Sequence, residues 1–327
     1  MTGFDAEMLK QKQKLYSKIL LFIIVLSGFV AIPFIVSRFY LYLTTEILIV
    51  SLFAVSTNLL LGYTGLLSFG QVAFFGTSSY CISLLLTKSD ISFLNAFILS
   101  IILASIAALI IGYFCIRLRA FYFAILTLSF SQLFYAVAYK WIDLTGGDDG
   151  IVGVPKKAIL FIDLSESYNY YYFVFVVVLL SIAALYLVVK SPFGEVLQAI
   201  RDNPQRAEFT GLAIRNYQIA SFFIAGTFAG VAGALTAPFQ GIVTPELLHW
   251  SHSAEPLMIS LLGGMYNFFG PVAGAIIFVF IKEWITGFTE YWMFWYGLLL
   301  MFLIMYLPGG VMGYITDKIA LFAGSKE

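Results

Sequence analysis

Long apolar stretches separated by short polar segments run along almost the whole chain. Ten of them approach the length of a membrane-spanning helix, which needs ~20 apolar residues to cross ~30 Å of hydrocarbon. They lie near residues 19–36, 40–61, 67–87, 92–116, 120–139, 170–189, 217–237, 254–268, 271–287 and 292–308. The pattern predicts an all-α, polytopic transmembrane helix bundle of about ten spans, with some short or broken helices. Because only Gly270-Pro271 separates the eighth stretch from the ninth, one broken element there, and hence eight or nine spans, is the alternative.

The composition agrees with a membrane protein and excludes several soluble classes. Apolar residues make up 61% of the chain and charged residues only 11%, whereas soluble proteins carry about 25% charged residues. Basic and acidic residues are balanced, 18 against 18, so no nucleic-acid partner is expected. Cys81 and Cys115 lie in apolar runs, and His249 and His252 flank Trp250 in a predicted outer interfacial loop, so we expect no metal site. No glycine-rich phosphate loop is present, so any ATP-driven work falls to a partner.

The distribution of lysine and arginine predicts the orientation. With both termini inside, twelve of these residues lie in cytoplasmic segments and six lie outside, in agreement with the positive-inside rule. The expected parts are a cytoplasmic segment at 1–18, a transmembrane domain at 19–316 with an outer loop at 140–169 and an inner loop at 190–217, and a cytoplasmic tail at 317–327. The run at 19–36 follows four lysines, as in a signal peptide. Its core of ~18 residues and the lack of a small-residue cleavage site favour a retained first span.

The inner loop has the pattern of two short helices. Residues 195–201 place their apolar side chains on one face at helical spacing. Asn203 is a natural N-cap and Pro204 a natural first helical residue, and Gly211 supplies the stop after a second helix that ends at Thr210. Such helices can dock into a groove of a partner protein. A solvated connector, or a helix lying on the membrane surface, is the alternative.

A glycine-rich stretch interrupts the second and third apolar runs. Four glycines and no charged residue lie between Glu46 and Lys88. The uncharged polar side chains expected at membrane depth are Asn58, Thr64, Ser68 and Gln71. Broken helices with such groups line the pathways of transporters, so we assign these residues and Glu46 to a translocation pathway. The alternatives are a tight turn between two spans and, for Glu46, a side chain that reaches the interface.

Two other glycine series predict close packing of helices. Gly226, Gly230 and Gly233 form one series, and Gly270 and Gly274 repeat its spacing. Small residues at this spacing let helix backbones approach each other closely in lipid.

Several of these motifs, taken in order, resemble one family. They are the segments Asn58–Gly76, Thr145–Ile151, Ser191–Gly211, Leu262–Ala275 and Tyr306–Gly310. Together they resemble the permeases of branched-chain amino-acid ABC importers, of the LivM type, over roughly residues 40 to 315. One departure is Tyr266, which stands where the commonest family form has glycine.

The resemblance implies a non-catalytic permease subunit in the bacterial inner membrane. Its partners would be a second, LivH-like permease, two cytoplasmic ATPases that bind ATP and Mg, and a periplasmic amino-acid-binding protein. The family's ATPase contact falls on Ala207, Glu208 and Gly211. The full set assigned to ATPase coupling is Glu195, Arg201, Asn203, Pro204, Ala207, Glu208 and Gly211.

Other functions stay open from the residues alone. The same class of importer carrying urea, short amides or other amino acids is one alternative, because these solutes also suit a pathway of low charge. A secondary transporter driven by an ion gradient would need intramembrane acids, and we place only Glu46 well inside a predicted span, which counts against this alternative. An intramembrane enzyme would need a cluster of catalytic or metal-binding residues, which the pattern lacks.

Overall fold

The structure is a computed structural model that describes residues 28–324, apart from 31, 119–120, 160–161 and 308. The predicted segment at 1–18, most of the predicted span at 19–36 and the last residues of the predicted tail lie outside this part. The chain divides into two units, Met1–Thr44 and Thr45–Glu327. The second unit, which helix α2 leads into, holds the elements that bear on function.

The described chain is mostly helical, as predicted. The main helices are α2 (Arg38–Asn58), α3 (Gln71–Lys88), α4 (Phe93–Cys115), α5 (Phe121–Lys140), α7 (Ser167–Lys190), α8 (Pro192–Asp202), α9 (Pro204–Phe209), α10 (Ile214–Gln240), α11 (Trp250–Gly263), α12 (Gly270–Thr286), α13 (Trp292–Tyr306) and α14 (Gly310–Gly324). The short elements are η1 (Leu59–Thr64), α6 (Ile142–Thr145), η2 (Gly147–Asp149), β1 (Ile151–Val152), β2 (Ile242–Val243) and η3 (Pro245–Leu248). The two strands pair antiparallel, with Ile151 opposite Val243.

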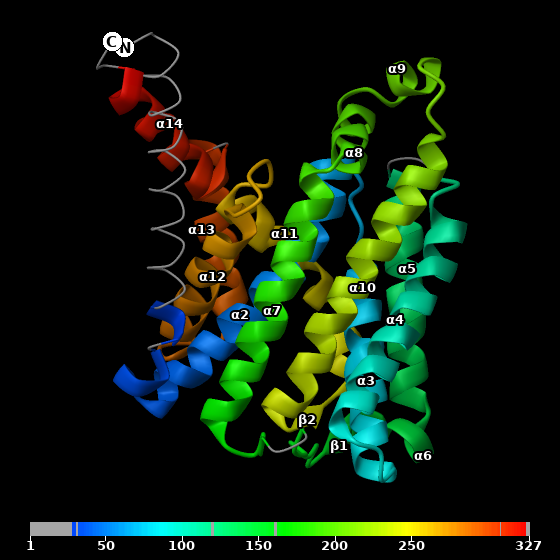
Figure 1. Ribbon diagram of the computed structural model, residues 1–327, viewed down its shortest axis with the longest axis vertical. Coiled ribbons are helices and arrows are strands. Elements are labelled where there is room, and N and C mark those ends of the chain that lie inside the picture. Colours follow the sequence, from blue (N-terminus) through cyan, green and yellow to red (C-terminus); the bar gives the residue numbers. More distant parts are fainter. Residues whose placement is uncertain (1–27, 31, 119–120, 160–161, 308, 325–327) are drawn as a thin grey trace, which may run out of the picture. The chain divides into compact units, whose positions relative to one another are not determined.

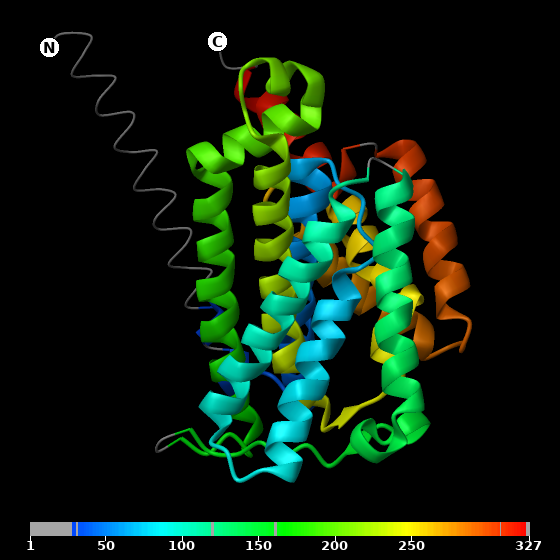
Figure 2. The ribbon, with the colours of Figure 1, turned by 90° about the vertical axis from the view of Figure 1, so that its right-hand side faces the viewer.

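Within the described residues, five helices are long and apolar enough to cross a membrane: α2 continued by η1, α4, α5, α7 and α10. The protein is therefore a multi-pass membrane protein. Helix α3 falls outside this group because of its polar residues, yet it packs against both α10 and α4, which also contact each other (Figures 1 and 2). A polar helix is tolerated there because protein, and not lipid, surrounds it.

Helices that face outward and helices that face inward carry different residues. Helix α4 exposes a row of large apolar side chains, among them Ile98, Ile102 and Ile106, each about half exposed. Its other face buries Ala104 and Ala108 completely. An apolar face toward lipid and a small-residue face toward the neighbouring helices are what a bilayer requires.

The eighth and ninth predicted spans are separate helices. Helix α11 ends at Gly263, the chain turns through residues 264–269, and α12 begins at Gly270. The two helices remain in close contact along their length. Both are shorter than a full span, so the expectation of short helices in this region is met.

The region after residue 309 differs from the expected end of the bundle. A further helix, α14, occupies Gly310–Gly324, where we expected the domain to finish and a tail to begin at 317. Gly310 has φ +68° and lies against the backbone of Gly264. The chain therefore turns sharply after α13, and α14 packs on α11 and α12.

Candidate coupling region and intramembrane site

The inner loop forms two short helices at one end of the bundle, opposite the end that holds β1 and β2 (Figure 1). The side chain of Asn203 accepts a hydrogen bond of 2.9 Å from the backbone N–H of Arg206 and so caps α9. Pro204 begins the helix, where its missing N–H costs nothing. Gly211 has φ +83°, a conformation that glycine adopts without strain. The limits of α9 are thus set by the residues that the sequence singled out.

Helix α9 presents most of its surface to solvent. Pro204, Glu208 and Gly211 are exposed, whereas Ala207 is buried and anchors the helix. Phe209, which was not among the residues expected from the sequence, is 92% exposed. An aromatic ring that protrudes from a capped helix is the kind of group that anchors a protein interface.

Helix α8 is amphipathic and rests on the bundle. Leu197 and Ile200 are buried, whereas Glu195 is exposed. Gly194 lies so close to the carbonyl of Val189, at the end of α7, that no side chain would fit. This close approach fixes the corner between α7 and α8.

Arg201 points toward the bundle and not toward solvent. Its Nη1 donates a hydrogen bond of 2.6 Å to the carbonyl oxygen of Gly62. Its guanidinium lies 5.2 Å from the centre of the Tyr266 ring and 2.8 Å from the carboxylate of Asp202. The Cγ atom of Arg201 also borders Gly65 so tightly that an added Cβ would come within 2.9 Å of it. Arg201 therefore joins α8 to the end of η1 and to the 264–269 turn, and Tyr266 supplies one of its partners.

The glycine-rich stretch begins as a distorted helix and continues as a non-helical connection to α3. Helix α2 continues as the π-helix η1, Gly65 ends it with φ +75°, and the chain resumes as α3 at Gln71. The four predicted pathway residues in this region, Asn58, Thr64, Ser68 and Gln71, are each no more than 2% exposed. A π-helix is rare and marks functional positions more often than ordinary helix does.

Three of these four polar side chains hold the distortion together. Asn58 donates a hydrogen bond of 3.0 Å to the carbonyl of Met265. The hydroxyl of Thr64 lies 2.7 Å from that of Ser221 on α10. Ser68 accepts a hydrogen bond of 3.2 Å from the N–H of Gly70. Asn58 and Thr64 are thus positioned by neighbouring elements, and Ser68 is paired within its own connection. These hydrogen bonds explain how uncharged polar residues persist at this depth.

The fourth residue, Gln71, differs from the others. Both atoms of its side-chain amide are buried and, within the described part of the chain, make no hydrogen bond. A buried amide without a partner costs about 1–3 kcal/mol, so such groups gather where a protein needs a polar contact for function.

Glu46 borders a small cavity with three other ionisable residues. The cavity measures about 90 Å³, and its ionisable lining residues are Glu46, His252, Glu255 and Lys282, from α2, α11 and α12. We call it the charged cavity. Nδ1 of His252 lies 3.3 Å from a carboxylate oxygen of Glu255. Glu46 is therefore not alone, and Glu255 is a second carboxylate within a predicted span.

Part of this cluster lies elsewhere than the sequence predicted. His252 lies in helix α11 and not in an interfacial loop, because α11 begins at Trp250. His252 and Glu255 have the spacing i, i+3, which brings two side chains together on a helix. That spacing, next to an apolar run, was the signal that could have revealed the pair.

The two glycine series lie where helices touch. An added Cβ on Gly226 would overlap Ala108, one on Gly230 would come within 2.7 Å of Ala104, and one on Gly233 would overlap the carbonyl of Phe75. Likewise, Gly270 lies against the carbonyl of Gly264, and Gly274 against that of Ile259. The first series brings α10 onto α4 and α3, and the second brings α12 onto α11.

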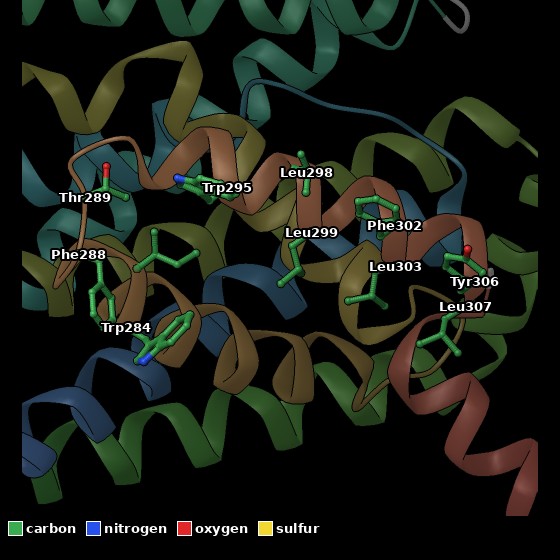
Figure 3. Close-up of a pocket in the computed structure, with 11 residues that line it drawn as sticks. Trp284, Phe288, Thr289, Trp295, Leu298, Leu299, Phe302, Leu303, Tyr306 and Leu307 are labelled. Atoms are coloured by element: carbon green, nitrogen blue, oxygen red, sulfur yellow. The ribbon is translucent and has the colours of Figure 1, made fainter.

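A larger hollow lies between α12 and α13 (Figure 3). It measures about 900 Å³, and Trp284, Phe288, Trp295 and Phe302 are prominent among the residues that line it. Among the described residues that line it, none is charged. It therefore offers apolar contact to lipid or to another membrane protein and lacks groups that would hold a polar solute.

Comparison with known proteins gives consistent matches. The family model described as branched-chain amino acid transport system / permease component matches residues 39–307. The high-affinity branched-chain amino acid transport system permease protein LivM of Escherichia coli (strain K12) is 28% identical, over 97% of this chain and 79% of its own length. LivM of Salmonella typhimurium has the same identity and coverage. The probable branched-chain amino acid transport permease protein LivM of Methanocaldococcus jannaschii is 24% identical, over 69% of this chain and 71% of its own length. No solved structure gives a significant match.

Proposed function

Because the chain belongs to the family of branched-chain amino acid transport system permease components, we propose that it is the membrane-spanning subunit of an ATP-driven importer of aliphatic amino acids. In this proposal a second, LivH-like permease completes the pathway across the bacterial inner membrane. Two cytoplasmic ATPases bind ATP and Mg and perform the hydrolysis, and a periplasmic protein delivers the amino acid. This chain binds neither ATP nor metal and catalyses no reaction.

The observation that carries the proposal is the geometry of α9. The helix is capped at both ends, stands at the end of the bundle and exposes Phe209 almost completely. A helix of this kind suits insertion into a groove of a partner protein. Ala207, Glu208 and Gly211, which the family resemblance assigns to ATPase contact, lie on or directly after it.

The contacts of Arg201 supply a route from α9 into the bundle. Helices α8 and α9 meet at Asn203, so a displacement of α9 moves α8. Arg201 on α8 holds the end of η1 through Gly62 and the 264–269 turn through Tyr266. Those two segments precede α3 and α12. Closure of the ATPases would thus shift η1 and the segments on either side of it. These segments bear Asn58, Thr64, Ser68 and Gln71, which we propose to line the pathway.

Two substitutions on α9 test this proposal. Glu208→Lys reverses an exposed charge, and Gly211→Val places a β-branched residue at a positive φ. Each should reduce the amount of ATPase that co-purifies with the permease, or separate ATP hydrolysis from leucine uptake in proteoliposomes. Glu290→Lys makes the same charge reversal in the turn between α12 and α13 and serves as the control. Normal uptake and normal ATPase recovery in both α9 variants would refute the docking assignment.

A further inference from the structure

The charged cavity combines opposite charges with an apolar wall. Two carboxylates, Glu46 and Glu255, share it with the ammonium of Lys282 and the imidazole of His252. Its apolar lining includes Phe53 and Ile259. Ionisable side chains are costly within a membrane bundle and are retained chiefly at functional positions.

The cavity lies toward the end of the bundle away from α9. Helix α10 begins just after α9 and ends at Gln240, which lines the cavity and is exposed. Thr236, one helical turn earlier, lines it as well and is buried. The cavity therefore extends from the face opposite the coupling helices into the bundle.

The size of the cavity limits what it can hold. Its volume of about 90 Å³ is several times the ~10–15 Å³ that admits one water molecule. It is well below the ~300 Å³ at the lower end of sites for drug-sized ligands. A small solute fits this range, whereas a peptide does not.

The arrangement of charges selects among small solutes. The cavity offers carboxylates and an ammonium group together, so it can provide a partner of opposite charge to both an ammonium and a carboxylate of a ligand. His252 holds Glu255 in place through their 3.3 Å contact. A solute with an ammonium group, a carboxylate and an aliphatic chain would meet an opposite charge at each end and an apolar wall between them.

We propose that the charged cavity is an intramembrane binding site for the zwitterionic head group of an aliphatic amino acid. Glu46 and Glu255 receive the α-ammonium, Lys282 receives the α-carboxylate, and the side chain lies against Phe53 and Ile259. This inference rests on the proposed function and adds to it a substrate site within this chain, separate from that of the periplasmic protein.

The test measures binding of radiolabelled L-leucine to the purified full-length transporter in nanodiscs without the periplasmic protein. L-leucinamide lacks the carboxylate, and 4-methylpentanoic acid lacks the ammonium group. Each should compete about tenfold or more weakly than leucine, because a hydrogen bond between charged groups is lost. This comparison uses unaltered protein and does not depend on how a variant folds.

Substitutions in the cavity then show which side chains bind the ammonium group and the carboxylate of leucine. Glu255→Gln should weaken leucine binding about tenfold or more, and Lys282→Met should do the same. In Lys282→Met, leucine and leucinamide should bind almost equally, because the partner of the carboxylate is gone. Glu283→Gln is the matched control: its side chain is exposed and does not line the cavity, so leucine affinity should be unchanged.

The results separate this site from the proposed function. Equal binding of leucine, leucinamide and 4-methylpentanoic acid, or unchanged affinity in Glu255→Gln and Lys282→Met, would overturn the site. If the transporter still imported leucine with its periplasmic protein, the proposed function would stand without this site. A transporter that neither imports nor binds leucine would contradict both.

Discussion

Single residues at close contacts determine whether this bundle can assemble. Gly233 is the tightest case on α10, since an added Cβ would overlap the backbone carbonyl of Phe75. The hydroxyl of Ser79 donates a hydrogen bond of 2.8 Å to the carbonyl of Gly233 at the same contact. Backbone atoms cannot rotate away as a side chain can, so α3 and α10 would have to separate.

Gly233→Ala should therefore destabilise the protein by about 1–3 kcal/mol, as overpacking does. Thermal unfolding of the purified transporter measures the effect. Gly297→Ala on α13 is the control, because an added Cβ there meets no atom within 4 Å. If the two variants had the same midpoint temperature of unfolding, the close contact between Gly233 and Phe75 would not limit the stability of the protein.

Arg201 is a second residue whose contacts can be tested by a single substitution. Arg201→Lys keeps the positive charge but loses the planar group that bonds Gly62 and Asp202 at once and faces Tyr266. We expect the interaction between α8 and the bundle to weaken by about 2 kcal/mol of free energy. Leucine uptake should fall about tenfold or more while ATP hydrolysis persists.

The control for this variant is Arg206→Lys, on the exposed surface of α9. It makes the same chemical change at the same end of the bundle. If Arg201→Lys and Arg206→Lys affected uptake equally, the route through Gly62 and Tyr266 would be wrong.

Helix α9 is the element on which the coupling proposal depends. Phe209→Ala removes its protruding ring without touching the cap at Asn203. Loss of an aromatic anchor at an interface typically costs about 2 kcal/mol or more. The affinity for the ATPases should therefore drop at least about tenfold, as measured by titration of the ATPases onto the permease.

Phe288→Ala is the matched control for this titration, since Phe288 is also strongly exposed but lies beyond the end of α12. It should leave the affinity for the ATPases unchanged. Retention of normal affinity by Phe209→Ala would remove α9 from the interface.

Elements with a strong local code were predictable from the sequence. The start of α9 is marked by the N-cap Asn203 and by Pro204, and its end is marked by Gly211. These residue types favour such positions whatever surrounds them. Elements whose structure depends on contacts with distant residues were harder to predict. The π-helix η1 depends on a hydrogen bond from Asn58 to Met265, more than two hundred residues away, and no local pattern reports such a contact.

In the molecule as a whole, hydropathy predicted an all-α membrane bundle. It did not predict which helices and polar residues lie inside that bundle. Long apolar runs identify helices that meet lipid, such as α4 and α7. Helix α3 is surrounded by protein and carries too many polar residues to stand out in the same way. The charged cavity was hidden for a related reason, because its residues come from helices far apart in the sequence.

Purification of the chain with its partners tests directly whether it is the permease of an ATP-driven importer. The tagged chain is co-purified in mild detergent with its bound proteins and placed in proteoliposomes, and leucine uptake and ATP hydrolysis are measured with the leucine-loaded periplasmic protein. We predict recovery of two ATPases and a second permease, hydrolysis stimulated by the loaded protein, and uptake that requires ATP. A chain that purifies alone and moves solute on an ion gradient would contradict the account and turn attention to Glu46.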